Sequence, residues 1–232
     1  LIRAKPEAVW APYFICGVVS DMMLSIGMNV RHYCLTENFG VPTDIELGTF
    51  DLLICVDYFG VCGSEVDATI RKYGAERVLV DASQSLYFQA CADSTTVFSP
   101  RKFVGVPDGG LLLSPYQPGL LSPTDETGSK FRSKHLLTRA SGQVQAGFLE
   151  FQEAEKSLIG CSPHAMSILT KTLLGNIDFD GIAVRRRANY AVLAEGLSAN
   201  GFQTIALPLT AVPLCVPVLD LNADRLMPQL AS

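Results

Sequence analysis

The sequence contains few histidines, and its cysteines lack the spacing of a metal site. There are 3 histidines among 232 residues, and His32, His135 and His164 are far apart along the chain. The 7 cysteines include no C-x-x-C pair, and most lie in apolar runs such as 53–56. A metal site is therefore disfavoured. We interpret the cysteines as buried, reduced thiols of a cytoplasmic protein, although Cys16 and Cys62 are candidate nucleophiles.

The chain also lacks an excess of positive charge and long apolar segments. Its 18 Lys and Arg residues are outnumbered by 23 Asp and Glu, and the dense cationic cluster Arg185-Arg186-Arg187 is interpreted as a solvated helix face. We therefore expect no nucleic-acid partner. We find no signal peptide and no apolar run long enough for a membrane helix, so no membrane association is expected. The 48% of hydrophobic residues predicts a folded core rather than disorder.

Short apolar segments alternate with amphipathic segments through the first half of the chain. Strands are predicted at 29–35, 51–57, 77–81, 95–99 and 110–114, with helices at 18–26 and 64–73. This order predicts an α/β fold with a mostly parallel central sheet flanked by helices.

The second half has a different character. The Pro-, Gly- and Ser-rich residues 116–129 predict a loop, which is followed by helices at 143–159, 166–174 and 180–200 and a strand at 214–219. Asp180 is the expected N-cap of the third helix. Residues 1–4 resemble the last turn of a helix and residues 224–232 the first turn of another.

Polar residues follow two of the predicted buried strands. Asp57 and Asp81 each lie at a strand end, where parallel sheets gather ligands, although such a residue can also simply begin a solvated turn. Gln84 follows Asp81 closely enough to share a crevice with it. Lys102 leaves the 95–99 strand and precedes Gly109-Gly110. An exposed lysine is the ordinary case, but small and apolar neighbours would favour its neutral, nucleophilic amine.

Taken together, these segments resemble the DegT/DnrJ/StrS family of sugar aminotransferases, which depend on pyridoxal 5′-phosphate (PLP). Val80-Asp81-Ala82-Ser83-Gln84 resembles the E-D-A-A-[HQ] motif, and Lys102 with Gly109-Gly110 resembles K-N-x-x-x-G-E-G-G. Residues 56–60 resemble V-H-x-[FY]-G, and residues 11–14 resemble V-P-x-x-[TS]. The similarity runs from residue 8 to 113 and more weakly to 219.

The resemblance implies a fold type I enzyme that transfers an amino group from an amino acid to a nucleotide-linked keto-sugar. Lys102 would form a Schiff base with PLP, Asp81 would pair with the pyridine nitrogen, and Gln84 would bind the phenolic oxygen. Ser99 would bind the phosphate, and Tyr13 or Phe14 would stack on the ring, although core packing is the commoner role of such aromatics. The family also implies a homodimer.

The resemblance implies two domains as well. Residues 1–175 would form a large PLP-binding domain whose first part, including a phosphate-binding helix, precedes residue 1. Residues 176–232 would begin a smaller C-terminal α/β domain.

Several positions depart from the family pattern. Ser99 is three residues before the lysine rather than five, Asp57 replaces a histidine, and Pro163-His164-Ala165-Met166 replaces N-[YF]-R-M. These changes motivate an alternative, a catalytically degenerate PLP-fold protein that acts as a structural or partner subunit. Sugar dehydration on the same fold is disfavoured, because related dehydratases carry histidine in place of the lysine.

Overall fold

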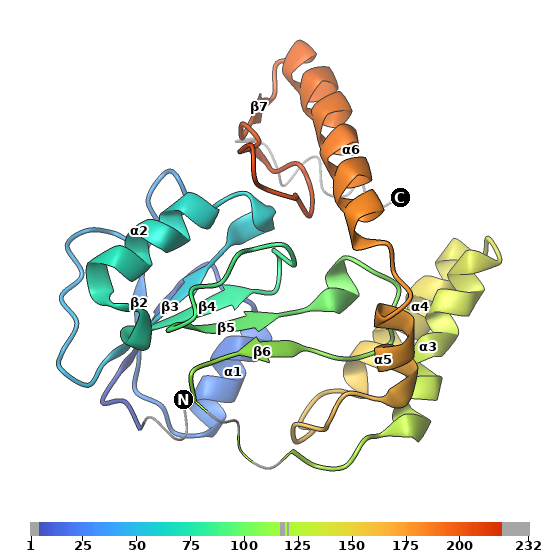
Figure 1. Cartoon of the computed structure of the whole chain (residues 1–232), viewed down its shortest axis with the longest axis horizontal. Helices are drawn as coiled ribbons and strands as arrows, with labels where there is room; N and C mark the ends of the chain where they lie inside the picture. The colour runs from blue at the N-terminus through green and yellow to red at the C-terminus, as the bar shows by residue number, and fades with distance from the viewer. Residues whose placement is uncertain (1–4, 117–118, 120, 220–232) are drawn as a thin grey trace.

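The fold is built on a six-stranded sheet with the strand order β2-β1-β3-β4-β5-β6 (Figure 1). The computed structural model describes residues 5–116, 119 and 121–219. Neighbouring strands run parallel except β6, which is antiparallel to β5. The strands are β1 (Val9–Pro12), β2 (Val30–Tyr33), β3 (Leu52–Val56), β4 (Val78–Ala82), β5 (Thr95–Phe98) and β6 (Leu111–Leu113). The predicted α/β class and the mostly parallel sheet are confirmed.

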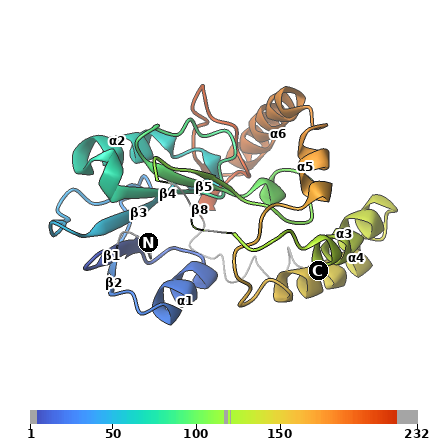
Figure 2. The ribbon, with the colours of Figure 1, turned by 60° about the horizontal axis from the view of Figure 1, so that its bottom comes forward.

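Helices cover both faces of this sheet, as the alternation along β3 requires. Leu53 and Cys55 face the helix α2 (Gly63–Tyr73) and pack with its Val66. Ile54 faces the other way, toward Met23 of the helix α1 (Gly17–Ser25). Figure 2 shows α1 and α2 on opposite sides of the strands. A strand that is covered on both faces needs apolar residues at successive positions. Its sequence is therefore a continuous apolar run, which is why β3 and β4 were predictable from sequence.

The second half of the chain is mainly helical. The helices are α3 (Glu126–Ala140), α4 (Val144–Lys156), α5 (Ile168–Leu174) and α6 (Phe179–Ala199). The last three confirm predictions, but α3 was not predicted, and the loop expected at 116–129 gives way to it at Glu126. Asp125 caps this helix by accepting a hydrogen bond from the Gly128 amide at 2.9 Å. α3 and α4 lie side by side at one end of the sheet (Figure 1).

Two smaller predictions in this half are wrong. The N-cap of α6 is Asp178, whose carboxylate accepts from the Gly181 amide at 2.8 Å, and not Asp180, which lies inside the first turn. The strand expected at 214–219 is reduced to β8 (Val218–Leu219), which pairs antiparallel with β7 (Gln203–Thr204). The helical turns expected at 1–4 and 224–232 lie outside the described residues.

The cysteines are less buried than their apolar sequence context suggested. Cys55 and Cys62 are buried, but Cys16, Cys34, Cys161 and Cys215 are exposed, and all seven are free thiols. The interpretation of the cysteines as mostly buried is therefore wrong, because several apolar runs end at the surface. Among the described residues, no helix is both long and apolar enough to cross a membrane.

Candidate functional site

Two of the predicted site residues lie at the same carboxyl edge of the central strands. β4 and β5 are neighbouring parallel strands, with Asp81 opposite Val97. The chain leaves β5 into a short 3₁₀ turn, η3 (Pro100–Lys102), which begins at the same edge. Parallel pairing thus places Asp81 and Lys102 at one edge of the sheet, although 20 residues separate them in the sequence.

Ser83 joins these two side chains. The Lys102 amine donates to the Ser83 hydroxyl at 3.2 Å, and the Ser83 amide donates to Asp81 Oδ1 at 2.9 Å. Asp81 and Ser83 are half-buried, whereas Lys102 is exposed. The expectation that small and apolar neighbours partly remove the lysine from water is therefore wrong. Ser83 lies in the motif at 80–84, but no role was predicted for its hydroxyl.

Gln84 lies one residue beyond Ser83 and is held by the next loop of the sheet edge. Its Oε1 accepts from the Phe59 amide at 3.0 Å, within a second 3₁₀ turn, η1 (Tyr58–Gly60). Phe59 has φ 59°, a left-handed conformation that costs a non-glycine residue energy and that its surroundings must hold in place. Because Oε1 is engaged, the NH₂ group is the part of the Gln84 amide that remains to donate.

Asp57 is a buried structural residue. Its side chain accepts from the Cys62 amide at 2.8 Å, at the start of α2, and the residue is 2% exposed. Burial raises the pKa of this carboxyl above its ordinary value. The sequence suggested that Asp57 either faces a ligand or begins a solvated turn. The structure shows neither, because the side chain is buried and binds the start of α2. Cys62 is also unsuited to be a nucleophile, because burial raises its pKa to about 12.

The aromatic residues after β1 are exposed. Tyr13 is 70% and Phe14 58% exposed, so core packing is the wrong role for both. Tyr13 stacks on His32 with ring centroids 5.0 Å apart, and Phe14 stacks on Tyr58 at 5.4 Å. Both follow the carboxyl end of β1, the strand two places from β4 in the sheet.

Ser99 lies at the start of the turn that carries Lys102. Its carbonyl accepts from the Lys102 amide at 3.2 Å, and the residue is half-buried. The turn therefore keeps Ser99 and Lys102 close in space, whatever ligand the serine hydroxyl binds.

A polar network that the sequence did not predict anchors the loop beyond Lys102. Asp108 accepts from the hydroxyls of Ser167 at 3.0 Å and Thr170 at 2.5 Å, and from the Arg132 guanidinium at 3.3 Å. Burial opposes ionisation of Asp108, but these hydrogen bonds outweigh it and lower its pKa. The network joins the loop before β6 to α3 and α5. Asp108 lies in the Lys102–Gly110 motif, and this position is the feature of the sequence that could have pointed to it.

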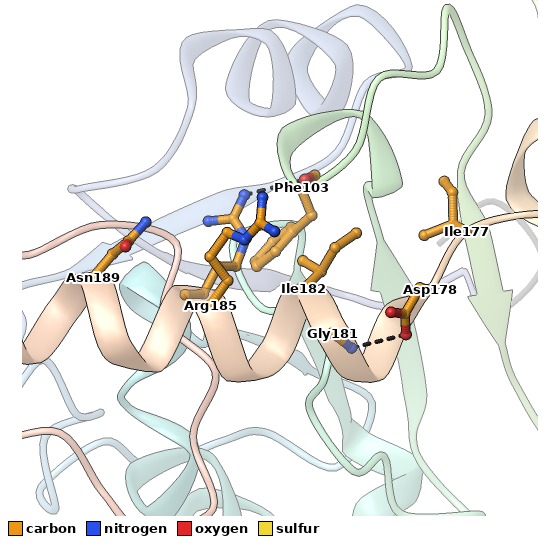
Figure 3. A pocket seen from close by; sticks show the side chains of 8 residues that line it. Phe103, Ile177, Asp178, Gly181, Ile182, Arg185 and Asn189 are labelled. Carbon is orange, nitrogen blue, oxygen red and sulfur yellow. Dashed lines mark hydrogen bonds between the residues drawn. The ribbon is translucent and has the colours of Figure 1, made fainter.

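An open cleft lies beside Phe103, the residue after Lys102. Its lining residues come from that loop and from the first turns of α6, and they include Ile177, Asp178, Arg185 and Asn189 (Figure 3). None of the predicted site residues lines it. In the described part of the chain, no three His, Cys, Asp or Glu side chains are grouped as metal ligands.

The arginine cluster at 185–187 is not the solvated face that its sequence suggested. Arg185 is exposed, but its two neighbours each bind backbone carbonyls. Arg186 binds those of Phe103, Pro213 and Leu214, and Arg187 binds those of Pro208 and Ala211.

No protein-family model and no curated protein matches this sequence. A functional assignment for the chain therefore depends on its motifs and on the geometry of the sheet edge.

Proposed function

We propose that this protein is a PLP-dependent aminotransferase that moves an amino group from an amino acid to a keto-sugar, with Lys102 as the cofactor-binding residue. The observation that carries the proposal is that the Lys102 amine and the Asp81 carboxylate both form a hydrogen bond with Ser83. The mostly parallel sheet is compatible with fold type I but is not specific to it.

The chemistry of these residues fits the groups that PLP presents. The aldehyde requires an amine, which Lys102 offers with its side chain exposed to solvent. The pyridine nitrogen requires a carboxylate, and Asp81 is already oriented through Oδ1. The phenolic oxygen requires a donor, which Gln84 retains because its Oε1 is engaged by Phe59. Ser99, in the same turn as Lys102, is our candidate for the phosphate, with Tyr13 or Phe14 for the ring face.

When bound, PLP supplies a ring that withdraws electrons from the substrate's α-carbon. Asp81 would keep a proton on the pyridine nitrogen, because a carboxylate at hydrogen-bond distance stabilises the protonated form. Lys102 would hold the cofactor at rest and then, as a free amine, move a proton at the substrate α-carbon. Ser83, between the two side chains, would set their relative orientation.

The rest of the assignment also stays a prediction. It comprises the nucleotide-linked form of the sugar, the homodimer, the cytoplasmic location, and the division into residues 1–175 and 176–232.

A second candidate function is that of a degenerate subunit without transaminase activity. Its basis is the segment at Pro163–Ala165, where the family has an amide and a guanidinium. The Ser122 amide donates to the Pro163 carbonyl at 3.0 Å and the Ala165 amide to the Ser122 carbonyl at 2.9 Å. Backbone pairing thus fixes this segment, and neither the proline nor the alanine side chain can replace the missing polar groups.

Titration with PLP, followed by a single turnover with glutamate, tests both candidates. An aminotransferase gives a visible absorbance band that glutamate bleaches, and Lys102→Ala loses the band while Lys130→Ala, an exposed lysine of α3, keeps it. A band that persists in Lys102→Ala would overturn the assignment. A wild-type band that no amino donor bleaches would favour the degenerate subunit.

A further inference from the structure

The guanidinium of Arg186 joins two distant segments of the chain. Its Nη2 donates to the Phe103 carbonyl at 3.1 Å, the bond drawn dashed at Phe103 in Figure 3. Its Nη1 donates to the carbonyls of Pro213 and Leu214 at 3.3 and 3.2 Å. The guanidinium carbon also lies 4.6 Å from the centre of the Phe103 ring. A planar fork with several donors can span these carbonyls together, which a single ammonium cannot.

The first of these segments is the turn that carries Lys102. Phe103 is the next residue, and its amide already closes the η3 turn on the Pro100 carbonyl at 2.9 Å. Its side chain is buried among apolar residues of α6 and of the segment that contains Leu214. Arg186 therefore holds the residue directly after the lysine in two ways, by a hydrogen bond to the Phe103 carbonyl and by contact with the Phe103 ring.

The second segment leads to Gln84. The Leu214 amide donates to the Phe59 carbonyl at 2.7 Å, and the Phe59 amide donates to Gln84 Oε1 at 3.0 Å. Gly60 packs closely between this segment and Gln84. A Cβ atom added to Gly60 would lie 2.7 Å from the Val212 carbonyl and 3.0 Å from the Gln84 carbonyl. Phe59 keeps its left-handed backbone only while such contacts hold it.

Neutral carbonyls are the partners that hold this cation. Among the described residues, no carboxylate lies within ion-pair distance of Arg186. The side chain is half-buried, and burial lowers its pKa. A partly desolvated guanidinium without a counter-ion depends on its hydrogen bonds, so the carbonyl positions and the arginine constrain one another.

We propose that Arg186 is a positioning residue, which fixes Lys102 through Phe103 and Gln84 through Leu214 and Phe59. This inference rests on the proposed PLP function for its catalytic meaning, but the coupling of the two segments is a property of the fold. Loss of Arg186 would loosen both cofactor-binding residues at once, although it touches neither side chain.

Arg187 provides a matched control on the same helix. It also donates to backbone carbonyls, those of Pro208 at 3.3 Å and of Ala211. These carbonyls belong to neither the Lys102 turn nor the Leu214–Phe59 connection. Arg187→Met therefore removes an equivalent clamp of α6 without releasing the site.

The test compares Arg186→Met, Arg186→Lys and Arg187→Met in two measurements. The first is the rate at which borohydride traps PLP on Lys102. We expect Arg186→Met to slow it by roughly tenfold to a hundredfold, the effect of a small misplacement of a reacting group. Arg186→Lys should remain impaired, and Arg187→Met should resemble the wild type. Equal rates in Arg186→Met and Arg187→Met would overturn the positioning role.

The second measurement needs no cofactor. Hydrogen exchange, followed by mass spectrometry, should accelerate in the peptides covering 57–62 and 99–106 in Arg186→Met and Arg186→Lys, and in neither for Arg187→Met. If the wild type traps no PLP, the proposed function fails, and the exchange data alone decide on Arg186. Faster exchange confined to α6 and the 203–211 segment would refute the coupling.

Discussion

Replacement of Asp108 by alanine should destabilise the protein by about 3 kcal/mol in total, because the buried Arg132 charge would lose one of its two carboxylate partners. The side chains of Asp108 and Arg132 are only 14% and 8% exposed. The hydroxyls of Ser167 and Thr170, residues 2% and 0% exposed, would lose their acceptor as well, at about 1 kcal/mol each. Asp125, 3.3 Å from Arg132, would still pair with this guanidinium in the variant. The expected loss of stability therefore lies at the low end of the range for breaking a buried ion pair.

Urea unfolding, monitored by circular dichroism, measures this difference. Asp125→Asn is the control, because its side chain is 42% exposed and asparagine can still cap α3. It should cost less than Asp108→Ala, because the Arg132–Asp125 pair that it weakens is open to solvent on the Asp125 side. Thr170→Val removes one donor to Asp108 and should fall between them, at about 1–2 kcal/mol. Equal losses in Asp108→Ala and Asp125→Asn would show that the network does not anchor the loop.

The pH dependence of stability gives a second readout of the same network. Its hydrogen bonds lower the pKa of Asp108, so the folded state binds fewer protons at this site than the unfolded chain. The stabilisation is present above the unfolded value of about 3.9 and is lost as pH falls through the lowered pKa. The acid loss should be smaller in Asp108→Ala than in the wild type.

Asp57 should behave in the opposite way, because burial raises its pKa and the folded state holds the extra proton. Its contribution to stability falls as pH rises from about 4 through the raised pKa. In Asp57→Asn, the urea concentration at the unfolding midpoint should therefore depend less on pH above about 4 than in the wild type. The same slope of midpoint against pH in Asp57→Asn and in the wild type would contradict the raised pKa of Asp57. Burial also raises the pKa of Cys55 and Cys62 to about 12, so iodoacetamide should label exposed Cys16 and Cys161 first. Mass mapping that finds Cys62 labelled as fast as Cys16 would contradict the buried site.

The sequence predicted the sheet well because its strands have strong local signals. Residues 51–57 form an apolar run with polar ends, and β3 occupies Leu52–Val56. The strand ends predicted a ligand crevice at Asp81 and Gln84, and the family resemblance alone implied that Lys102 belongs to the same site. The pairing register, with Asp81 opposite Val97, required the structure.

The missed features depend on contacts between distant residues. α3 has no clear apolar stripe, since its buried residues are Ser129, Arg132 and His135. Their partners, such as Asp108 and Ser167, lie far away in sequence, so periodicity could not identify the helix. The cluster at 185–187 looked solvated for the same reason, because charge alone does not reveal that Arg186 meets the carbonyls of Phe103 and Leu214.

Mass analysis of the protein after incubation with PLP and reduction with borohydride identifies the lysine that binds the cofactor. We expect one pyridoxyl group per chain, on the peptide that contains Lys102, and none on that peptide in Lys102→Ala. Asp81→Asn should weaken this labelling, because the carboxylate that Ser83 orients would be gone. Labelling spread over exposed lysines such as Lys130 and Lys171, with no preference for Lys102, would rule out Lys102 as the cofactor-binding residue.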